Sequence, residues 1–180
     1  MIVALAGRRI DRPNASPEHF PVRSVAAVGE RIRSALLADG ASALVSAAAC
    51  GADLTALGVA ETLGIRRRIV LPFPAAEFRA GSVVDRPGDW GPLFDRLVSE
   101  AEEAGDLEVL GLPKASAHPY ERTNAAILDR ALALGREARE QVRALVVWDG
   151  PLVGRTDYTL DFVEAAEHRG IPVRTIGSSS

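Results

Sequence analysis

The chain has 180 residues, 47% of them hydrophobic, and this length is typical of one globular domain with a single core. Its formal net charge of −3 disfavours general binding to a nucleic acid backbone, and no apolar run reaches the roughly 18 residues that a membrane span requires. The only cysteine, Cys50, excludes an intrachain disulfide, and the three histidines form no zinc-binding spacing with it. We therefore expect a cytoplasmic protein without a metal or other cofactor.

Short apolar runs rich in β-branched residues predict five strands, and a sixth run, which Glu108 interrupts, predicts an edge strand. In chain order these runs are residues 2–6, 43–46, 68–71, 107–110, 143–148 and 173–176. Alternation places the Glu108 carboxylate on a solvated edge. The arginines at positions 66–68 predict a solvated entry into the third strand.

Apolar residues at helical spacing fill the segments between these strands. The predicted helices include residues 25–36, 54–60, 93–101, 127–134 and 160–166. Glycine favours a left-handed helix C-cap, and a glycine follows four of the helices, at Gly40, Gly64, Gly105 and Gly170. The alternation predicts an α/β fold: a doubly wound, mainly parallel, Rossmann-like sheet of five to six strands with helices on both faces. We expect one domain over residues 1–177, with 178–180 as a disordered tail.

Two segments are too long for ordinary connections. Residues 10–21 and 72–90 each contain three prolines and follow predicted strands. Long loops are often functional, and ligands of open α/β sheets bind beyond the carboxyl ends of the strands. In the second segment, Phe73, Phe78 and Trp90 either pack over a nucleobase or anchor an ordered loop.

The turn after the first strand is Gly7-Arg8-Arg9. Glycine allows the backbone to approach a ligand closely, and an arginine can hold a phosphate through two hydrogen bonds. Gly7, Arg8 and Arg9 are therefore candidate ligand-binding residues. The alternative is an ordinary strand end with two solvated arginines.

The turn after the second strand contains Cys50, Gly51 and Asp53 among small residues and opens a helix. The free N–H groups and positive dipole end of such a helix favour a bound anion, so this turn is a candidate phosphate cradle. Asp53 either stabilises the start of the helix or accepts hydrogen bonds from a ribose. Cys50 lacks an identifiable neighbouring base, so we interpret it as a buried small residue and not as a nucleophile.

The turn after the fifth strand predicts a second cradle. It includes Gly150, Gly154, Arg155 and Thr156, and it again opens a helix. Gly154, the Thr156 hydroxyl and the N–H groups that follow are suited to an anion. The spacing matches neither the dinucleotide fingerprint nor a P-loop.

A further cluster precedes the helix around residues 127–134. Tyr120 is suited to stacking on a base, and Arg122 and Asn124 to hydrogen bonding with it. The alternative is a plain helix entry with Pro119 in a starting role. His118 is interpreted as a surface residue because no carboxylate partner can be assigned to it.

The order of these turns resembles the SLOG superfamily, the Rossmann-like group that includes the DprA/Smf proteins and the LOG phosphoribohydrolases. Residues 46–57, followed by a strand that ends at Pro72, are similar to its small-Gly-Asp turn, helix and next strand. Residues 147–150 with 154–157 resemble its late strand and Gly-Thr phosphate turn, and residues 7–13 resemble the opening of related signalling domains. Pro72 joins the ligand-binding candidates on this basis.

The resemblance implies binding of a nucleotide or a nucleotide-derived signal, such as a cyclic nucleotide or an ADP-ribose derivative. Such domains often act as sensors that control an attached effector domain or a homo-oligomer. LOG enzymes cleave a nucleoside monophosphate with a Pro-Gly-Gly-x-Gly-Thr-x-x-Glu motif, but here Arg155 replaces its final glycine and Thr159 stands in place of its glutamate.

We therefore expect non-catalytic binding of a small nucleotide ligand. The alternative is a hydrolase or transferase acting at an N-glycosidic bond, with Glu121 as the candidate carboxylate. A third possibility is binding of single-stranded DNA, as in DprA, which the negative net charge disfavours.

Overall fold

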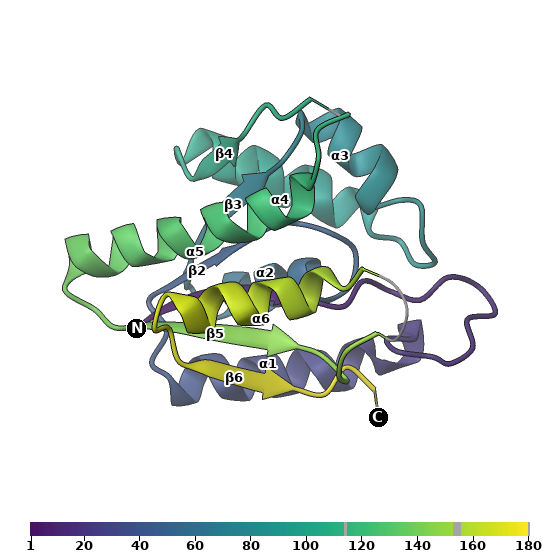
Figure 1. Ribbon diagram of the computed structural model, residues 1–180, viewed down its shortest axis with the longest axis horizontal. Helices are drawn as coiled ribbons and strands as arrows, with labels where there is room; N and C mark the ends of the chain where they lie inside the picture. Colours follow the sequence, from purple (N-terminus) through teal and green to yellow (C-terminus); the bar gives the residue numbers. More distant parts are fainter. Residues whose placement is uncertain (114, 153–155, 180) are drawn as a thin grey trace.

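One parallel sheet forms the centre of the protein (Figure 1). The computed structural model describes residues 1–113, 115–152 and 156–179, and in these residues the sheet has six strands in the order β4-β3-β2-β1-β5-β6. The strands are β1 (Ile2–Gly7), β2 (Ala43–Ser46), β3 (Arg66–Leu71), β4 (Leu107–Val109), β5 (Val142–Val147) and β6 (Val173–Ile176). The predicted α/β class is confirmed, and every strand begins and ends within two residues of the position expected from the sequence.

Helices cover both faces of the sheet (Figure 1). They are α1 (Val25–Ala38), α2 (Ala52–Thr62), α3 (Ala75–Ser82), α4 (Gly91–Glu103), α5 (Pro119–Ala138) and α6 (Tyr158–His168), with a short 3-10 turn, η1 (Val22–Ser24). Alternate residues of a strand point to opposite faces. Val3 and Leu5 of β1 therefore pack with α1, α2 and α4, whereas Ile2 and Ala4 pack with α5 and α6. In the part of the chain that is described, no helix is long and apolar enough to span a bilayer.

Helix α3 lies inside the segment that was expected to be a long loop. Pro72 and Pro74 precede this helix and do not interrupt it, since Pro74 occupies its N-cap position. Phe78 anchors the helix: its side chain is buried and its ring stacks on Phe94 with the ring centroids 6.1 Å apart. The prolines that suggested an irregular loop therefore mark the start of a helix.

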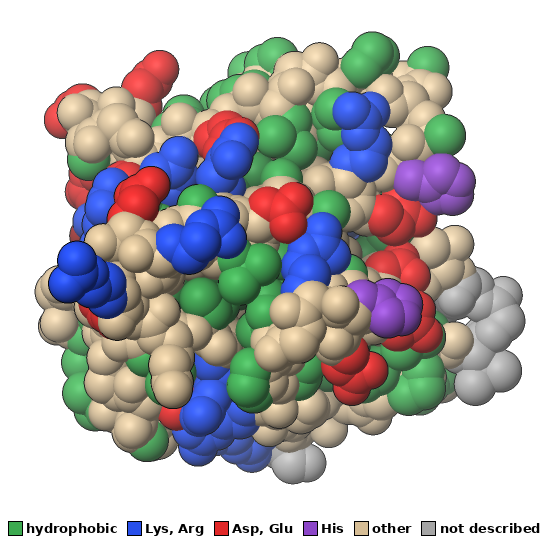
Figure 2. Space-filling view, turned by 60° about the vertical axis from the view of Figure 1, so that its left-hand side comes forward, with side chains coloured by type: hydrophobic (Ala, Val, Ile, Leu, Met, Phe, Trp, Pro, Cys, Tyr) green, Lys and Arg blue, Asp and Glu red, His purple; other side chains and the backbone are tan. Residues whose placement is uncertain are grey.

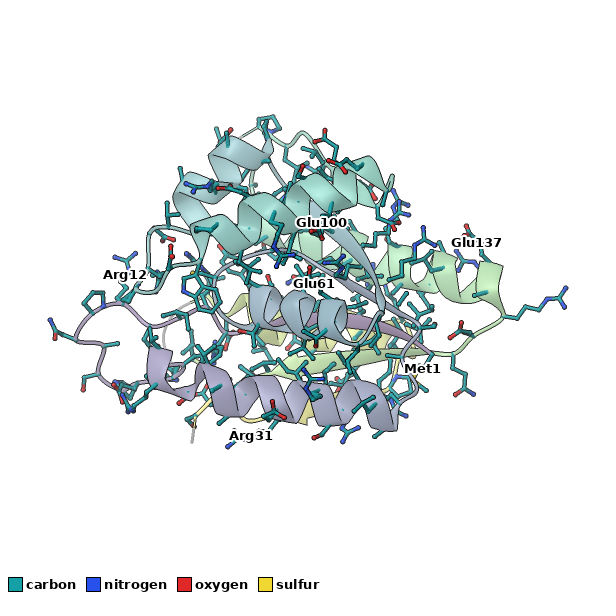
Figure 3. All side chains as sticks on the ribbon, turned by 180° about the vertical axis from the view of Figure 1, so that it is seen from behind. Met1, Arg12, Arg31, Glu61, Glu100 and Glu137 are labelled. Atoms are coloured by element: carbon teal, nitrogen blue, oxygen red, sulfur yellow. The ribbon has the colours of Figure 1, made fainter. Side chains whose placement is uncertain are left out.

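Of the three arginines at the start of β3, Arg66 is solvated as expected, with its side chain 53% exposed. Arg67 and Arg68 correct the expectation, because their side chains are only 23% and 24% exposed. Arg67 reaches Glu100, at 3.1 Å, and Glu61, both labelled in Figure 3. Carboxylates on the neighbouring elements thus compensate the positive charge of this strand.

Ser178 and Ser179, two residues of the expected tail, contact the rest of the fold, whereas residue 180 lies outside the described residues. Ser178 is buried, and its hydroxyl donates a hydrogen bond of 2.7 Å to the carbonyl of His19. Arg31 of α1 donates to the carbonyls of Gly177 and Ser179, at 2.9 Å each. Residues 177–179 thus contact both α1 and the loop that follows β1.

Gly51 allows the turn before α2 to lie directly against the loop after β1. Its φ is +110°, and a Cβ built there would lie 2.7 Å from the Arg8 carbonyl oxygen and 2.8 Å from the Ile10 nitrogen. Gly7 is equally enclosed, because a Cβ there would lie 2.7 Å from the Cβ atoms of Ala52 and Val147. These two glycines bring the ends of β1 and β5 and the start of α2 into contact.

We expect Gly51→Ala to lower the free energy of unfolding by about 3 kcal/mol, because the added Cβ is strained at this φ and overlaps backbone atoms. The matched control is Gly58→Ala within α2, where a Cβ meets nothing within 4 Å. This control should be neutral or raise the stability by about 0.5–1 kcal/mol. Urea unfolding of both variants measures the difference. Equal effects would show that the backbone contact at Gly51 is unimportant.

Candidate functional site

A pocket of about 650 Å³ lies at the carboxyl ends of the central strands. From β1 the chain proceeds outward through β2, β3 and β4 on one side and then returns to the other side of β1 at β5. This reversal leaves a crevice above β1, which is where open α/β sheets bind ligands. The pocket is lined by the end of β1, the starts of α2, α5 and α6, and the loop after β1.

Two tyrosines and an asparagine form one wall of the pocket. The ring centroids of Tyr120 and Tyr158 lie 5.0 Å apart, and the two ring planes are inclined by 51°. Phe73 packs edge-to-face on Tyr120, with the ring centroids 6.2 Å apart. Asn124 is mostly buried, and its Nδ2 donates a hydrogen bond of 2.8 Å to the Tyr158 carbonyl. Tyr120 and Asn124 therefore line a common wall, as their sequence cluster suggested.

Arg8 lines the pocket, but its guanidinium is already engaged with the protein. Nε donates to Asp149 at 2.9 Å, Nη1 donates to Asp157 at 2.8 Å, and Nη2 donates to the carbonyl of Gly150. The side chain is only 7% exposed and lies 6.0 Å from the ring centroid of Trp148. Arg8 is therefore a clamp between three segments and not the freely available phosphate ligand that the sequence suggested.

The Asp157 carboxylate caps the N-terminus of α6. One of its oxygens accepts from the N–H groups of Thr159 and Leu160, at 3.0 and 3.3 Å, and the other accepts from Leu152 at 2.9 Å. Burial opposes ionisation, but the bonds from Leu152 and Arg8 outweigh it and hold the pKa of Asp157 below its ordinary value. The anion position of this helix is thus occupied by the protein's own carboxylate.

This cap lies where the sequence predicted the second cradle. Gly154 and Arg155 lie outside the described residues, and Gly150 contributes its carbonyl to Arg8 without lining the pocket. Thr156 is exposed and does line it. Of the cradle residues that the structure describes, Thr156 is therefore the one that a ligand in the pocket can reach.

The first predicted cradle is also largely closed. The Ala52 N–H donates to the Arg8 carbonyl at 3.0 Å, and the Leu54 N–H donates to the Ala49 carbonyl at 3.2 Å. Gly51 and Cys50 do not line the pocket. The donors that were expected to hold a phosphate are therefore used to pack α2 against the neighbouring loop.

Cys50 is a buried residue, as expected from the sequence. Its sulfur accepts a 3.5 Å contact from Arg9 Nη2. Burial raises the pKa of the Cys50 thiol, and the positive charge of Arg9 only partly offsets this effect. A buried thiol with a raised pKa is a poor nucleophile.

Asp53 is the pocket residue with the most perturbed carboxyl group. It is 8% exposed, and its Oδ2 accepts a hydrogen bond of 3.1 Å from the Ala49 N–H, ahead of the helix. Burial raises the pKa of Asp53 to about 7, although the bond from Ala49 and the charge of Arg9 act in the opposite direction. The residue therefore exchanges a proton near neutral pH at the wall of the pocket.

Three arginines form the outer rim of the pocket, and two of them were not identified from the sequence. Arg9 pairs with Asp85, and Arg86 donates from Nη1 to the Ile10 carbonyl at 3.0 Å. Arg12 is exposed on the loop between β1 and α1 (Figure 3), and its guanidinium has no hydrogen bond or ion pair within the described residues. Arg12 is therefore the rim guanidinium most available to a phosphate.

His19 was also missed by the sequence analysis. It lines the pocket, and its Nδ1 bonds the carboxylate of Asp149, the residue that also accepts from Arg8. Asp11 fixes the backbone at this point by accepting from the N–H groups of His19 and Phe20, at 2.9 and 2.8 Å. No local pattern reveals the pair, because His19 and Asp149 are 130 positions apart.

Three further candidates from the sequence do not line the pocket, namely Pro72, Glu121 and Arg122, and neither does His118. His118 is 74% exposed, as expected for a surface residue, but it does have a carboxylate partner, since its Nδ1 lies 2.7 Å from Glu121. This pair occupies the first turn of α5. The candidate carboxylate for glycosidic cleavage is therefore outside the pocket and engaged with a histidine.

Comparison with known proteins gives a likeness of structure. No protein-family model matches the chain, and no curated protein matches it. The chain is similar to the X-ray structure of DNA processing protein A (DprA) from Streptococcus pneumoniae, with 17% sequence identity and a TM-score of 0.44. The match covers 97% of this chain and 58% of the DprA chain, so the chain spans less than two thirds of that protein. DprA belongs to the superfamily that the sequence resembles, but what the pocket binds has to follow from its own geometry.

We expect Asp157→Asn to lower the free energy of unfolding by about 3 kcal/mol at neutral pH, because the buried Arg8 and the start of α6 lose their carboxylate. The pKa of Asp157 is lowered in the folded protein, so its contribution is present above the ordinary value of about 4 and is lost as the pH falls through the lowered pKa. The difference between the variant and the wild type should therefore shrink in acid. Urea unfolding at pH 7 and near pH 3 measures it.

Asp161→Asn, on the same helix, is the matched control. Burial and the neighbouring charges of Glu121 and Glu164 raise the pKa of Asp161, so ionisation of this group is less favourable in the folded protein than in the unfolded chain. This variant should be neutral or more stable. A loss of stability similar to that of Asp157→Asn would contradict the specific role of the cap.

Proposed function

We propose that this domain binds a nucleotide or a nucleotide-derived signal, without catalysis, in the pocket above β1. The observation that carries the proposal is the combination of a tyrosine wall and an arginine rim in one pocket at the point where the strand order reverses. Its volume of about 650 Å³ lies within the range typical of small-molecule sites.

The tyrosine wall supports binding of a base. Tyr120 and Tyr158 offer aromatic surface, and stacking on such rings accepts any nucleobase. The Asn124 Nδ2 is committed to the Tyr158 carbonyl, so its Oδ1 is the atom free to accept a hydrogen bond from an amino group of the ligand. The base therefore fits beside the starts of α5 and α6.

The arginine rim supports binding of phosphate. Four arginines line the pocket, against three aspartates, although the whole chain is negatively charged. Arg8 is engaged with its clamp, so the binding role falls to Arg12, with Arg9 and Arg86 adding positive potential from the same side. A guanidinium recognises phosphate well because its donors match two phosphate oxygens.

The position of Glu121 favours binding over cleavage. The N-glycosidic hydrolase or transferase, the alternative from the sequence, requires a carboxylate beside the bound ligand. Glu121 is paired with His118 outside the pocket. At the position that corresponds to the LOG glutamate in the sequence resemblance, the residue that lines the pocket is Thr159. The residues at hand thus support a sensor that holds its ligand intact.

The charge distribution supports a small ligand over a nucleic acid backbone. Figure 2 shows basic and acidic side chains interspersed on one face of the molecule, and the net charge of the chain is −3. Binding of a long polyanion favours a field of one sign. We extend the proposal to a cytoplasmic sensor that acts through an attached effector domain or through homo-oligomerisation.

Titration calorimetry with adenine and guanine nucleotides, cyclic nucleotides and ADP-ribose tests this proposal. At least one of these ligands should bind with 1:1 stoichiometry, and Arg12→Ala should weaken that binding about tenfold, since one charge-assisted contact to phosphate is lost. Because the Arg12 side chain is exposed and makes no hydrogen bond or ion pair within the described residues, its removal should leave the thermal unfolding temperature unchanged.

Arg33→Ala is the control for the loss of one positive charge. Arg33 lies on α1, bonds Thr62 and does not line the pocket, so its removal should leave the affinity unchanged. A single-stranded DNA oligonucleotide is titrated for comparison. Tight binding of this DNA without binding of any nucleotide would refute the proposal. So would a folded protein that binds none of the ligands.

A further inference from the structure

The Asp53 carboxyl has one oxygen left for a ligand. Within the described residues its single hydrogen bond is the one from the Ala49 N–H to Oδ2, which leaves Oδ1 without a donor. The side chain is more than nine-tenths buried, yet the residue lines the pocket together with Ala47 and Gly7. These small neighbours offer no hydrogen bond from a side chain. Oδ1 therefore depends on solvent or on a ligand in the pocket for a hydrogen-bond donor.

Asp53 follows a turn that is connected to both parts of the proposed site. Cys50, at the turn before α2, contacts Arg9 of the rim through its sulfur at 3.5 Å. The Cys50 N–H donates to the carbonyl of Ser82 at 3.0 Å, and the Ser82 hydroxyl lies 3.5 Å from that of Tyr120. The turn before α2 is thus linked to the arginine rim directly and to the tyrosine wall through Ser82. In a nucleotide, the ribose joins the phosphate to the base.

We propose that Asp53 accepts a hydrogen bond from a ribose hydroxyl and that the ligand is therefore a ribonucleotide or a ribonucleotide derivative. The inference rests on the proposed function and names the part of the ligand that Asp53 contacts. Hydroxyl groups are the donors that a ribose offers, and a carboxylate is a strong acceptor for them. A ligand without these hydroxyls leaves the Asp53 oxygen unpaired in a buried place, which costs affinity.

Binding should also release a proton. In the free protein, burial raises the pKa of Asp53 to about 7, so a large part of the population is protonated at neutral pH. Arg9 is the charged side chain that most directly favours ionisation. A hydroxyl donor favours the ionised form further, so the proton passes to solvent when the ligand binds. The other ionisable groups that line the pocket are Arg8, Asp11, Arg12, His19, Arg86, Tyr120, Asp157 and Tyr158.

The test compares ADP and GDP with their 2′-deoxy and 2′,3′-dideoxy forms on the wild-type protein. We expect the dideoxy forms to bind about tenfold or more weakly, the loss typical of a hydrogen bond to a charged group. Calorimetry at pH 7 in two buffers of different ionisation enthalpy should show proton release with the ribonucleotides. Equal affinity of the ribo and dideoxy forms, or proton uptake on binding, would overturn the inference and leave the proposed function standing.

Two substitutions assign the effect to Asp53. Asp53→Ala should bind ribo and dideoxy forms equally, and Asp53→Asn should abolish the proton release, because an amide does not titrate. Asp129→Asn is the matched control, since Asp129 is 56% exposed on α5 and pairs with Arg169. Asp129→Asn should retain both the preference for ribo over dideoxy forms and the proton release. If Asp53→Ala also retained these two effects, the role of Asp53 would be refuted.

The comparison of ribo and dideoxy nucleotides on the wild-type protein tests the ribose contact even where a variant does not fold. Failure of every ribonucleotide to bind would overturn the proposed function, and this inference with it. Binding without discrimination between the sugars would overturn this inference alone.

Discussion

The guanidinium of Arg8 is the contact on which the geometry of the site depends. It joins the end of β1 to the turn after β5 and to the start of α6 through Asp149, Gly150 and Asp157. A charge this deeply buried has to be compensated where it lies, since an unpaired buried charge is costly. The clamp satisfies Arg8 and the α6 terminus with a single carboxylate. Consequently neither remains open to an anion, and in the proposed function it is the loop after β1 that binds the phosphate.

The periodicity of the sequence was sufficient to predict the sheet and five of the helices, because apolar spacing reports burial directly. Helix α3 was not predicted, because its one deeply buried large apolar residue, Phe78, follows two prolines that suggested a loop. The arginines of β3 were misjudged for a related reason. Their carboxylate partners, such as Glu100, are distant in sequence. The sequence therefore suggested solvated arginines where the folded protein has ion pairs.

The pocket was harder to predict than the fold. The sequence identified Gly7, Arg8, Arg9, Asp53, Tyr120, Asn124 and Thr156, all of which line it. It also assigned ligand contacts to Cys50, Gly51 and Gly150, which do not. A turn of small residues looks the same whether its N–H groups face a ligand or a neighbouring loop, and only the tertiary structure distinguishes the two. Arg12, His19 and Arg86 were missed because no local motif surrounds them.

The peptide bond between Asp157 and Tyr158 links the two halves of the site. Asp157 belongs to the clamp, whereas Tyr158 supplies a ring of the aromatic wall and the carbonyl that holds Asn124. A change in the clamp would therefore shift the tyrosine wall of the pocket. If the proposed function holds, ligand selectivity is open to evolutionary change at positions such as Arg8, whose guanidinium is committed to the scaffold. Comparison of the residues that face the pocket most openly would overlook such divergence.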